Sequence, residues 1–379
     1  MSERLFTRGF VLLTAADLAY FTATGVAVYA LPLYVTGPLG AGEAAAGLAF
    51  GAFAVSALVL RPFAGVLADR WGRAPLLVAG AALCAVGMGL TALADSLVAV
   101  VLLRLLLGVA EAAFFVAGFA ALADLAAPSR MGEALSYNSL GLYLGLAFGP
   151  PLGEWLVERA DFAAAWLGAA ALAAGGAVLS LLLGETRTGP RTAGPVRLVH
   201  RAAIAPSIGF FASLAAIGGF LAFAALRAEE VGLRDASLPL FLYGAVVVVS
   251  RIALAKVPDR VPSLPLGATA LAVIGAGLGV AAFVGAPVGL LTGTVLLALG
   301  VSLSTPAFFS AVFATASPEQ RGAASGTASA FIDLGLGGGP ILLGLVAGSA
   351  GIPWAFAAAA GIALAGCAWI VWTNQGRPA

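Results

Sequence analysis

The chain has 379 residues, of which 61% are hydrophobic and only 10% are charged, and its net charge is +1. A soluble domain carries about 25% charged residues, so these values exclude an ordinary soluble protein. The near-zero net charge also gives no electrostatic basis for binding nucleic acid. With a mean hydropathy of +1.04, the composition predicts a protein embedded in a membrane.

The apolar segments predict an all-α polytopic membrane protein. A helix that spans a bilayer needs about 20 apolar residues, and twelve segments meet this requirement. In chain order the expected spans are 8–35, 43–67, 74–95, 98–124, 134–157, 163–184, 200–226, 236–257, 264–283, 287–314, 322–348 and 353–373. The apolar run that starts at Phe10 is the first span, so we expect no cleavable signal.

The loops between the spans are short, which argues against catalysis. The longest polar gap is 185–199, too short to fold as a soluble domain, so we do not expect an enzyme. No phosphate-binding loop is present to bind ATP. The one histidine, His200, and the two cysteines, Cys84 and Cys367, predict neither a metal site nor a disulfide. We expect no cofactor.

Basic residues flank the spans unevenly. With both termini inside, Arg and Lys on the inner side outnumber those on the outer side, which carries only Arg159, Arg227 and Arg234. Because basic loops stay in the cytoplasm, we expect both termini there and a location in the inner (plasma) membrane. Arg61 and Arg251 lie near inner ends of spans, where their side chains are expected to reach the interface.

The chain matches itself at an offset of 190 residues. The matching positions are Arg61, Asp69 and Arg70 with Arg251, Asp259 and Arg260; Pro128 and Gly132 with Pro318 and Gly322; and Gly149-Pro150 with Gly339-Pro340. A duplicated apolar chain is typical of transporters built from two repeats. We expect a boundary within the polar gap, giving halves 1–190 and 191–379 of six spans each.

The gap between spans 2 and 3 reads Gly65-Val-Leu-Ala-Asp69-Arg70-Trp-Gly72-Arg73. Its glycines allow a tight reversal, and a carboxylate favours the start of the next helix. Arg70 and Arg73 are expected to face anionic headgroups. A charged turn that only fixes the topology would explain these residues equally well.

The string closely resembles the GxLaDrxGrkxxl signature of the major facilitator superfamily, with Ala74 in place of the usual Lys. The resemblance implies two pseudo-symmetric six-helix bundles, alternating access and a monomer. It also implies that the loop braces the two halves and controls their conformational switch. The residues that inherit this role are Gly65, Asp69, Arg70, Gly72 and Arg73, with Arg251, Asp259 and Arg260 in the second copy.

Span 5 contains Gly145, Gly149, Pro150 and Gly153. Small residues four apart let another helix approach closely, and simple packing would account for them. The string also resembles the GxxxGPxxGG motif of the superfamily's antiporters, the 12-helix drug/proton exchangers, which implies export. Glu154 replaces the last glycine of that motif.

Four charged residues lie well inside the expected spans: Asp17, Arg104, Glu111 and Asp333. Such charges are costly in a bilayer and mark functional sites or ion pairs. Arg104 and Glu111 share one helix face. Either one carboxylate, with Asp17 favoured, exchanges a proton for cargo, or Arg104 and Glu111 form a structural ion pair. In the family, spans 1 and 4 line the central cavity, while Asp333 lies on span 11 at its border.

Aromatic residues and one amide on the expected cavity helices are candidates for binding cargo, although aromatic side chains in spans more often serve packing. They are Tyr20, Phe21, Phe114, Phe115, Phe119, Asn138 and Tyr143. The scarcity of polar side chains favours a lipophilic or amphipathic small molecule, moved outward in exchange for protons. A facilitator or symporter for a sugar, amino acid derivative or siderophore is the alternative, and a non-transporting membrane sensor is a third.

Overall fold

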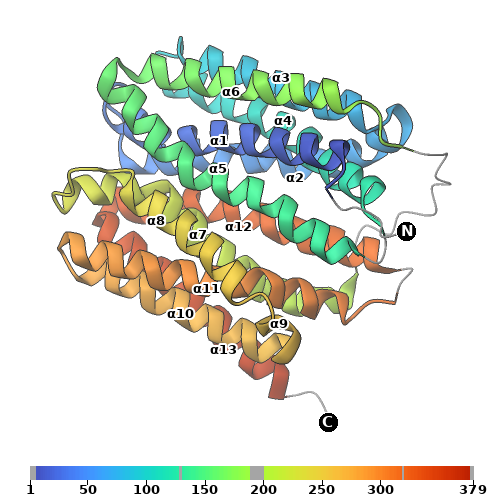
Figure 1. The fold of residues 1–379 in the computed structure, drawn as a ribbon. Helices are drawn as coiled ribbons and strands as arrows, with labels where there is room; N and C mark the ends of the chain where they lie inside the picture. The colour runs from blue at the N-terminus through green and yellow to red at the C-terminus, as the bar shows by residue number, and fades with distance from the viewer. Residues whose placement is uncertain (1–5, 128–129, 188–199, 318–319, 376–379) are drawn as a thin grey trace. The chain divides into compact units, whose positions relative to one another are not determined.

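The computed structural model describes residues 6–127, 130–187, 200–317 and 320–375, and throughout these ranges the only regular structure is helical (Figure 1). The long helices are α1 (Arg8–Thr36), α2 (Glu43–Trp71), α3 (Arg73–Thr91), α4 (Leu97–Leu125), α5 (Met131–Arg159), α6 (Phe162–Leu183), α7 (Ile204–Glu230), α8 (Leu238–Ala253), α10 (Ser263–Phe283), α11 (Pro287–Phe313), α12 (Arg321–Ala350) and α13 (Ile352–Gln375). They correspond to the twelve expected spans, so the all-α prediction is confirmed. In the described ranges, 10 helices are long and apolar enough to cross a membrane.

Short polar residues and glycines set the helix ends. The Asp161 carboxylate caps α6 by accepting a hydrogen bond from the backbone N–H of Ala164, at 2.8 Å. Ser96 caps α4 in the same manner through Ala99. Between α2 and α3 the chain reverses at Gly72, whose φ of 101° suits only glycine. The reversal after α2 is therefore fixed locally.

The second copy of this helix pair ends differently. We expected a span over 236–257, but α8 ends at Ala253 and a separate one-turn helix, α9 (Val257–Arg260), follows. Pro258 lacks the N–H that would bond to the carbonyl of Leu254, four residues earlier, so it removes one hydrogen bond that would hold a continued α8 together. In the first copy the corresponding residue is Ala68, and α2 runs unbroken to Trp71.

The chain forms two compact units. Unit 1 contains residues 1–34 and 55–192, and unit 2 contains 35–54 and 193–379. The expected boundary between residues 190 and 191 lies outside the described residues, so the division into halves stays a prediction. The start of α2 belongs to unit 2 because Gly47 and Gly51 contact the backbone of α12, at Gly344 and Gly337, with no side chain between.

Within unit 1, α1 and α5 also meet backbone to backbone. A Cβ at Gly149 would lie 2.6 Å from the Cα of Gly25, and one at Gly145 would lie 2.7 Å from the backbone nitrogen of Thr22. In unit 2, Gly339 of α12 likewise contacts the backbone of Ala215 on α7: a Cβ at Gly339 would lie 2.6 Å from the Cα of Ala215. Each repeat therefore holds its first and fifth helices together through glycines.

This contact predicts that Gly149→Ala lowers the thermal stability of the purified protein in detergent. The new methyl group has no room against α1, and overpacking of this kind costs about 1–3 kcal/mol. Gly175→Ala is the matched control, because a Cβ there meets nothing within 4 Å and alanine favours the helix. Equal melting temperatures for the two variants would contradict the close contact.

Candidate functional site

Asp17 lies on α1, and only 6% of its surface is exposed. The Asn138 side-chain amide on α5 donates a hydrogen bond to its carboxylate at 2.6 Å. The Thr14 hydroxyl donates in turn to the carbonyl oxygen of Asn138 at 3.1 Å. Asn138, expected to bind cargo, is thus also the partner of the carboxylate favoured as proton carrier, a pairing between residues 121 positions apart.

Glu111 on α4 pairs with Arg61 on α2. The Arg61 Nη2 and Glu111 Oε1 atoms are 2.9 Å apart, and the two side chains are 13% and 17% exposed. The Arg61 guanidinium also lies over the Phe115 ring, with 4.7 Å from its Cζ to the ring centroid. The expectation that Arg61 reaches out to the interface is therefore wrong: a carboxylate inside unit 1 holds it.

The second carboxylate oxygen of Glu111, Oε2, is buried and has no hydrogen-bond partner among the described residues. A buried acceptor of this kind is costly unless a proton or a ligand satisfies it. Arg104 on the same helix lies within electrostatic range of Glu111. In Glu111, therefore, Oε1 is paired with Arg61 and Oε2 has no hydrogen-bond partner, and a second arginine, Arg104, is close by.

Arg104 lies in a small polar group within the core of unit 1. It is 8% exposed and close to Tyr20 and Cys84, whose hydroxyl and thiol lie near each other. The Tyr20 ring stacks on Phe114, with centroids 4.1 Å apart. Tyr20 and Phe114 are almost fully buried, so both pack the core, and their proposed contact with cargo stays a prediction.

The remaining cavity candidates are more accessible. Phe119 is 50% exposed and its ring is 4.7 Å from that of Phe115, while Phe21 and Tyr143 are half-buried. Asp333 lies on α12 in unit 2 and is 3% exposed. Asp17, Arg104 and Glu111 therefore all lie in unit 1, where Arg104 is close to Glu111, and Asp333 belongs to the other unit.

In the α2–α3 loop, Arg73 is 1% exposed, so the expectation that it faces headgroups is wrong. Its guanidinium donates to the carbonyl oxygen of Ala68 at 2.6 Å, to the Asp69 carboxylate at 2.9 Å and to the Asp124 carboxylate at 3.1 Å. Arg70 is exposed. Arg73 therefore binds the end of α2 to the end of α4.

Two further residues, which the sequence did not single out, complete this loop. Glu185, just after α6, accepts hydrogen bonds from the backbone N–H groups of Arg73 at 3.0 Å and Ala74 at 3.3 Å, and so caps α3. The Arg187 guanidinium donates to the carbonyl oxygen of Asp69 at 2.6 Å and caps α2. We call Glu185 and Arg187 the linker clamp. The signal in the sequence that could have identified them is that a carboxylate and an arginine directly follow a span.

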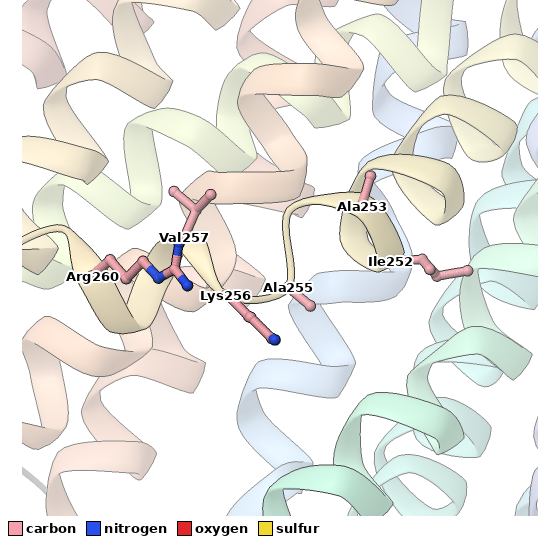
Figure 2. A pocket seen from close by; sticks show the side chains of 6 residues that line it. All are labelled: Ile252, Ala253, Ala255, Lys256, Val257 and Arg260. Carbon is pink, nitrogen blue, oxygen red and sulfur yellow. The ribbon is translucent and has the colours of Figure 1, made fainter.

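The carboxylates that bind this loop are not repeated in the second copy. At the 190-residue offset, Asp124 corresponds to Ala314 and Glu185 to Gln375. Instead, α8 and α9 border a hollow of about 390 Å³ into which the loop presents Lys256 and Arg260 (Figure 2). The side chain of Asp259 lies outside the described part of the structure. The repeats therefore share the Asp-Arg pair of this loop but not its carboxylate partners.

The comparisons with known proteins agree with this architecture. The model of the Major Facilitator Superfamily matches residues 13–313, so the chain belongs to this family of membrane transporters. An uncharacterized MFS-type transporter of Salmonella typhimurium is 29% identical over 366 residues, covering 94% of each chain.

Among solved structures, two transporters show the same fold. A bacterial homologue of the human lysosomal transporter Spinster, inward-facing and occupied, is similar with a TM-score of 0.77 at 16% identity, covering 97% of this chain and 96% of that one. A POT family transporter has a TM-score of 0.83 at 12% identity, with coverage of 97% and 96%. The protein is therefore a multi-pass membrane transporter of the MFS fold.

The linker clamp predicts a pH-dependent contribution to stability. Partial burial by itself raises the pKa of Glu185, but the backbone N–H donors of Arg73, Arg187 and Ala74 outweigh it and lower that pKa below its ordinary 4.5. A carboxyl whose pKa is lower in the folded state stabilises the fold above its unfolded pKa, and this contribution is lost as the pH falls through the folded pKa.

We therefore expect Glu185→Gln to melt at a lower temperature than the unmodified protein at pH 7, with the difference shrinking as the pH falls below 4.5 and vanishing once the pH is below the folded pKa of Glu185. Because Glu185 is exposed, solvent screening limits the effect to a fraction of about 1 kcal/mol. Tryptophan fluorescence during heating in detergent measures it. Glu158→Gln, an exposed carboxylate on α5, is the control. A difference that stays constant with pH would rule out this explanation.

Proposed function

We propose that the protein exports a small lipophilic or amphipathic molecule in exchange for protons, by alternating access. The observation that carries this proposal is the pair of carboxylates inside unit 1. Asp17 is buried against an amide, and Glu111 keeps one buried oxygen without a partner. A buried carboxylate with few partners is suited to gain and lose a proton, because neither form is fully stabilised by its surroundings.

Proton binding would also change how these groups hold their neighbours. A protonated Glu111 no longer attracts Arg61, so the link between α2 and α4 weakens. Release of the proton restores the ion pair. Cargo and proton would therefore favour different arrangements of the same helices, which is what exchange requires. The antiporter-like glycines at 145, 149 and 153 favour export over import.

The predominantly apolar surroundings favour lipophilic cargo. Phe115 and Phe119 form an aromatic pair beside the Arg61–Glu111 ion pair, and aromatic surface next to a charged pair suits an amphipathic molecule. We further propose that the protein is a monomer in the inner membrane with both termini in the cytoplasm, as the distribution of basic residues favours. A symporter for a polar metabolite is the second candidate, because Asn138 and Thr14 could bind hydroxyl groups.

Asp17→Asn and Glu111→Gln should each abolish export driven by a pH gradient. The protein is reconstituted into vesicles, ethidium movement is followed by fluorescence, and a trapped pH dye reports the proton. In the unmodified protein we expect protons to move opposite to ethidium, and either variant should slow this exchange at least tenfold. Glu158→Gln should leave it unchanged.

Two results would contradict the proposal. Coupled exchange that persists in both variants would remove these carboxylates from the mechanism. Protons that move with the cargo, or vesicles that take up lactose or alanine but never ethidium, would favour the symporter instead.

A further inference from the structure

The seam between α1 and α5 carries a second polar pair, distinct from Asp17 and Asn138. Tyr29 lies twelve residues after Asp17 on α1, which is about 18 Å further along the helix axis. Its hydroxyl donates to the Oε1 atom of Glu154 on α5 at 3.5 Å. Tyr29 is 5% exposed and Glu154 9%. The seam therefore has one buried carboxylate toward each end.

Packing alone does not explain Glu154. It follows Gly153 directly, in the position where the antiporter-type motif has its last glycine. The seam is otherwise built from glycines, such as Gly25 and Gly149, that let the two backbones touch. A buried carboxylate in such a seam costs desolvation energy that a glycine would not. The substitution is therefore expected to serve a chemical purpose.

Between the two pairs, α1 and α5 are in close backbone contact. The hydroxyls of Thr22 and Thr24 donate to carbonyl oxygens of their own helix, at Leu18 and Tyr20. Gly145 and Gly149 meet the backbone of α1 with no side chain between. The two polar pairs therefore lie at separate places along the seam.

Glu154 has ionisable residues near it on its own and neighbouring helices of unit 1. On α1 it contacts Tyr29, and on α5 itself Glu158 and Arg159 follow one turn later. The helix α6, which packs against α5, has no ionisable side chain from Phe162 to Leu183. The helix α4, which also contacts α5, contributes the groups already described: Arg104, Glu111 and Asp124.

We propose that Glu154 is a second proton-exchange site of this transporter, serving the opposite end of the α1–α5 seam from Asp17, with Tyr29 as its positioning residue. When the proton leaves, the carboxylate remains and accepts the Tyr29 hydrogen bond. When a proton returns, the neutral acid fits the apolar seam. With both termini in the cytoplasm, Glu154 would serve the outer side. This inference rests on the proposed proton exchange.

Infrared titration tests the site without any cargo. Difference spectra of the full-length protein in vesicles are recorded across the pH range in which it exchanges ethidium for protons. We expect a carboxyl C=O band that disappears in Glu154→Gln and persists in Asp17→Asn. A spectrum of Glu154→Gln identical to that of the unmodified protein would overturn the proposal.

Transport separates a proton site from a structural latch. Ethidium–proton exchange should fall at least tenfold in Glu154→Gln, which keeps a hydrogen-bond acceptor for Tyr29, and equally in Glu154→Gly, which restores the motif residue and buries no polar group. Tyr29→Phe keeps the carboxylate, so exchange should persist with a changed pH profile. Glu158→Gln is the matched control on the same helix.

If Glu154 only held α1 and α5 together through Tyr29, the results would be reversed: Tyr29→Phe would lose transport and Glu154→Gln would keep it. That result, or full coupling in Glu154→Gly, overturns the proposal while the proton exchange of the unmodified protein stands. If instead the unmodified protein moves no protons with ethidium, the proposed function itself fails. If the unmodified protein moves no protons with ethidium while the Glu154 carboxyl band still changes with pH, Glu154 binds a proton that transport does not use.

Discussion

A charged side chain inside a membrane-spanning helix must find its partner on a neighbouring helix, because lipid provides none. This constraint explains the polar contacts within unit 1. Asp17 on α1 is held from α5, Glu111 on α4 from α2, and Glu154 on α5 from α1. Each pair joins two helices, so a change in the charge of one member changes how firmly those helices are held. Transport by helix movement and control by protons would follow from the same contacts.

The two repeats share their helix-packing glycines but not their buried carboxylates. Both use glycines to bring their first and fifth helices into backbone contact, at Gly149 in unit 1 and Gly339 in unit 2. The carboxylates described above have no equivalents at the 190-residue offset: Asp17 corresponds to Ser207 and Glu111 to Val301. Glu185 of the linker clamp likewise corresponds to Gln375. The shared positions therefore preserve packing and the charges of the loop, whereas each of these carboxylates occurs in one copy only.

Much of the fold followed from the sequence. The twelve spans, the tight turn at Gly72 and the family were all predicted, because the length of an apolar run and the conformational freedom of a glycine are local properties. The candidate site was predicted only in part. Asp17, Arg104 and Glu111 were predicted as charges inside spans, but the sequence offered Glu111 only Arg104 of its own helix as a possible ion-pair partner, and Arg61 was expected to reach the interface. The break after α8 was not predicted, because a proline by itself does not end a helix here: α2 runs unbroken through Pro62.

By itself, the sequence determined that the protein is an all-helical membrane transporter built from two repeats, and which of its charges are too costly to be incidental. The tertiary structure decided the partners. Asn138 reaches Asp17 across 121 residues, Arg61 reaches Glu111 across 50, and Glu185 reaches Arg73 across 112. Hydrogen bonds act over about 3 Å, so they depend on which helices become neighbours. Hydrophobic periodicity does not encode this adjacency, because every span here is apolar on nearly all sides.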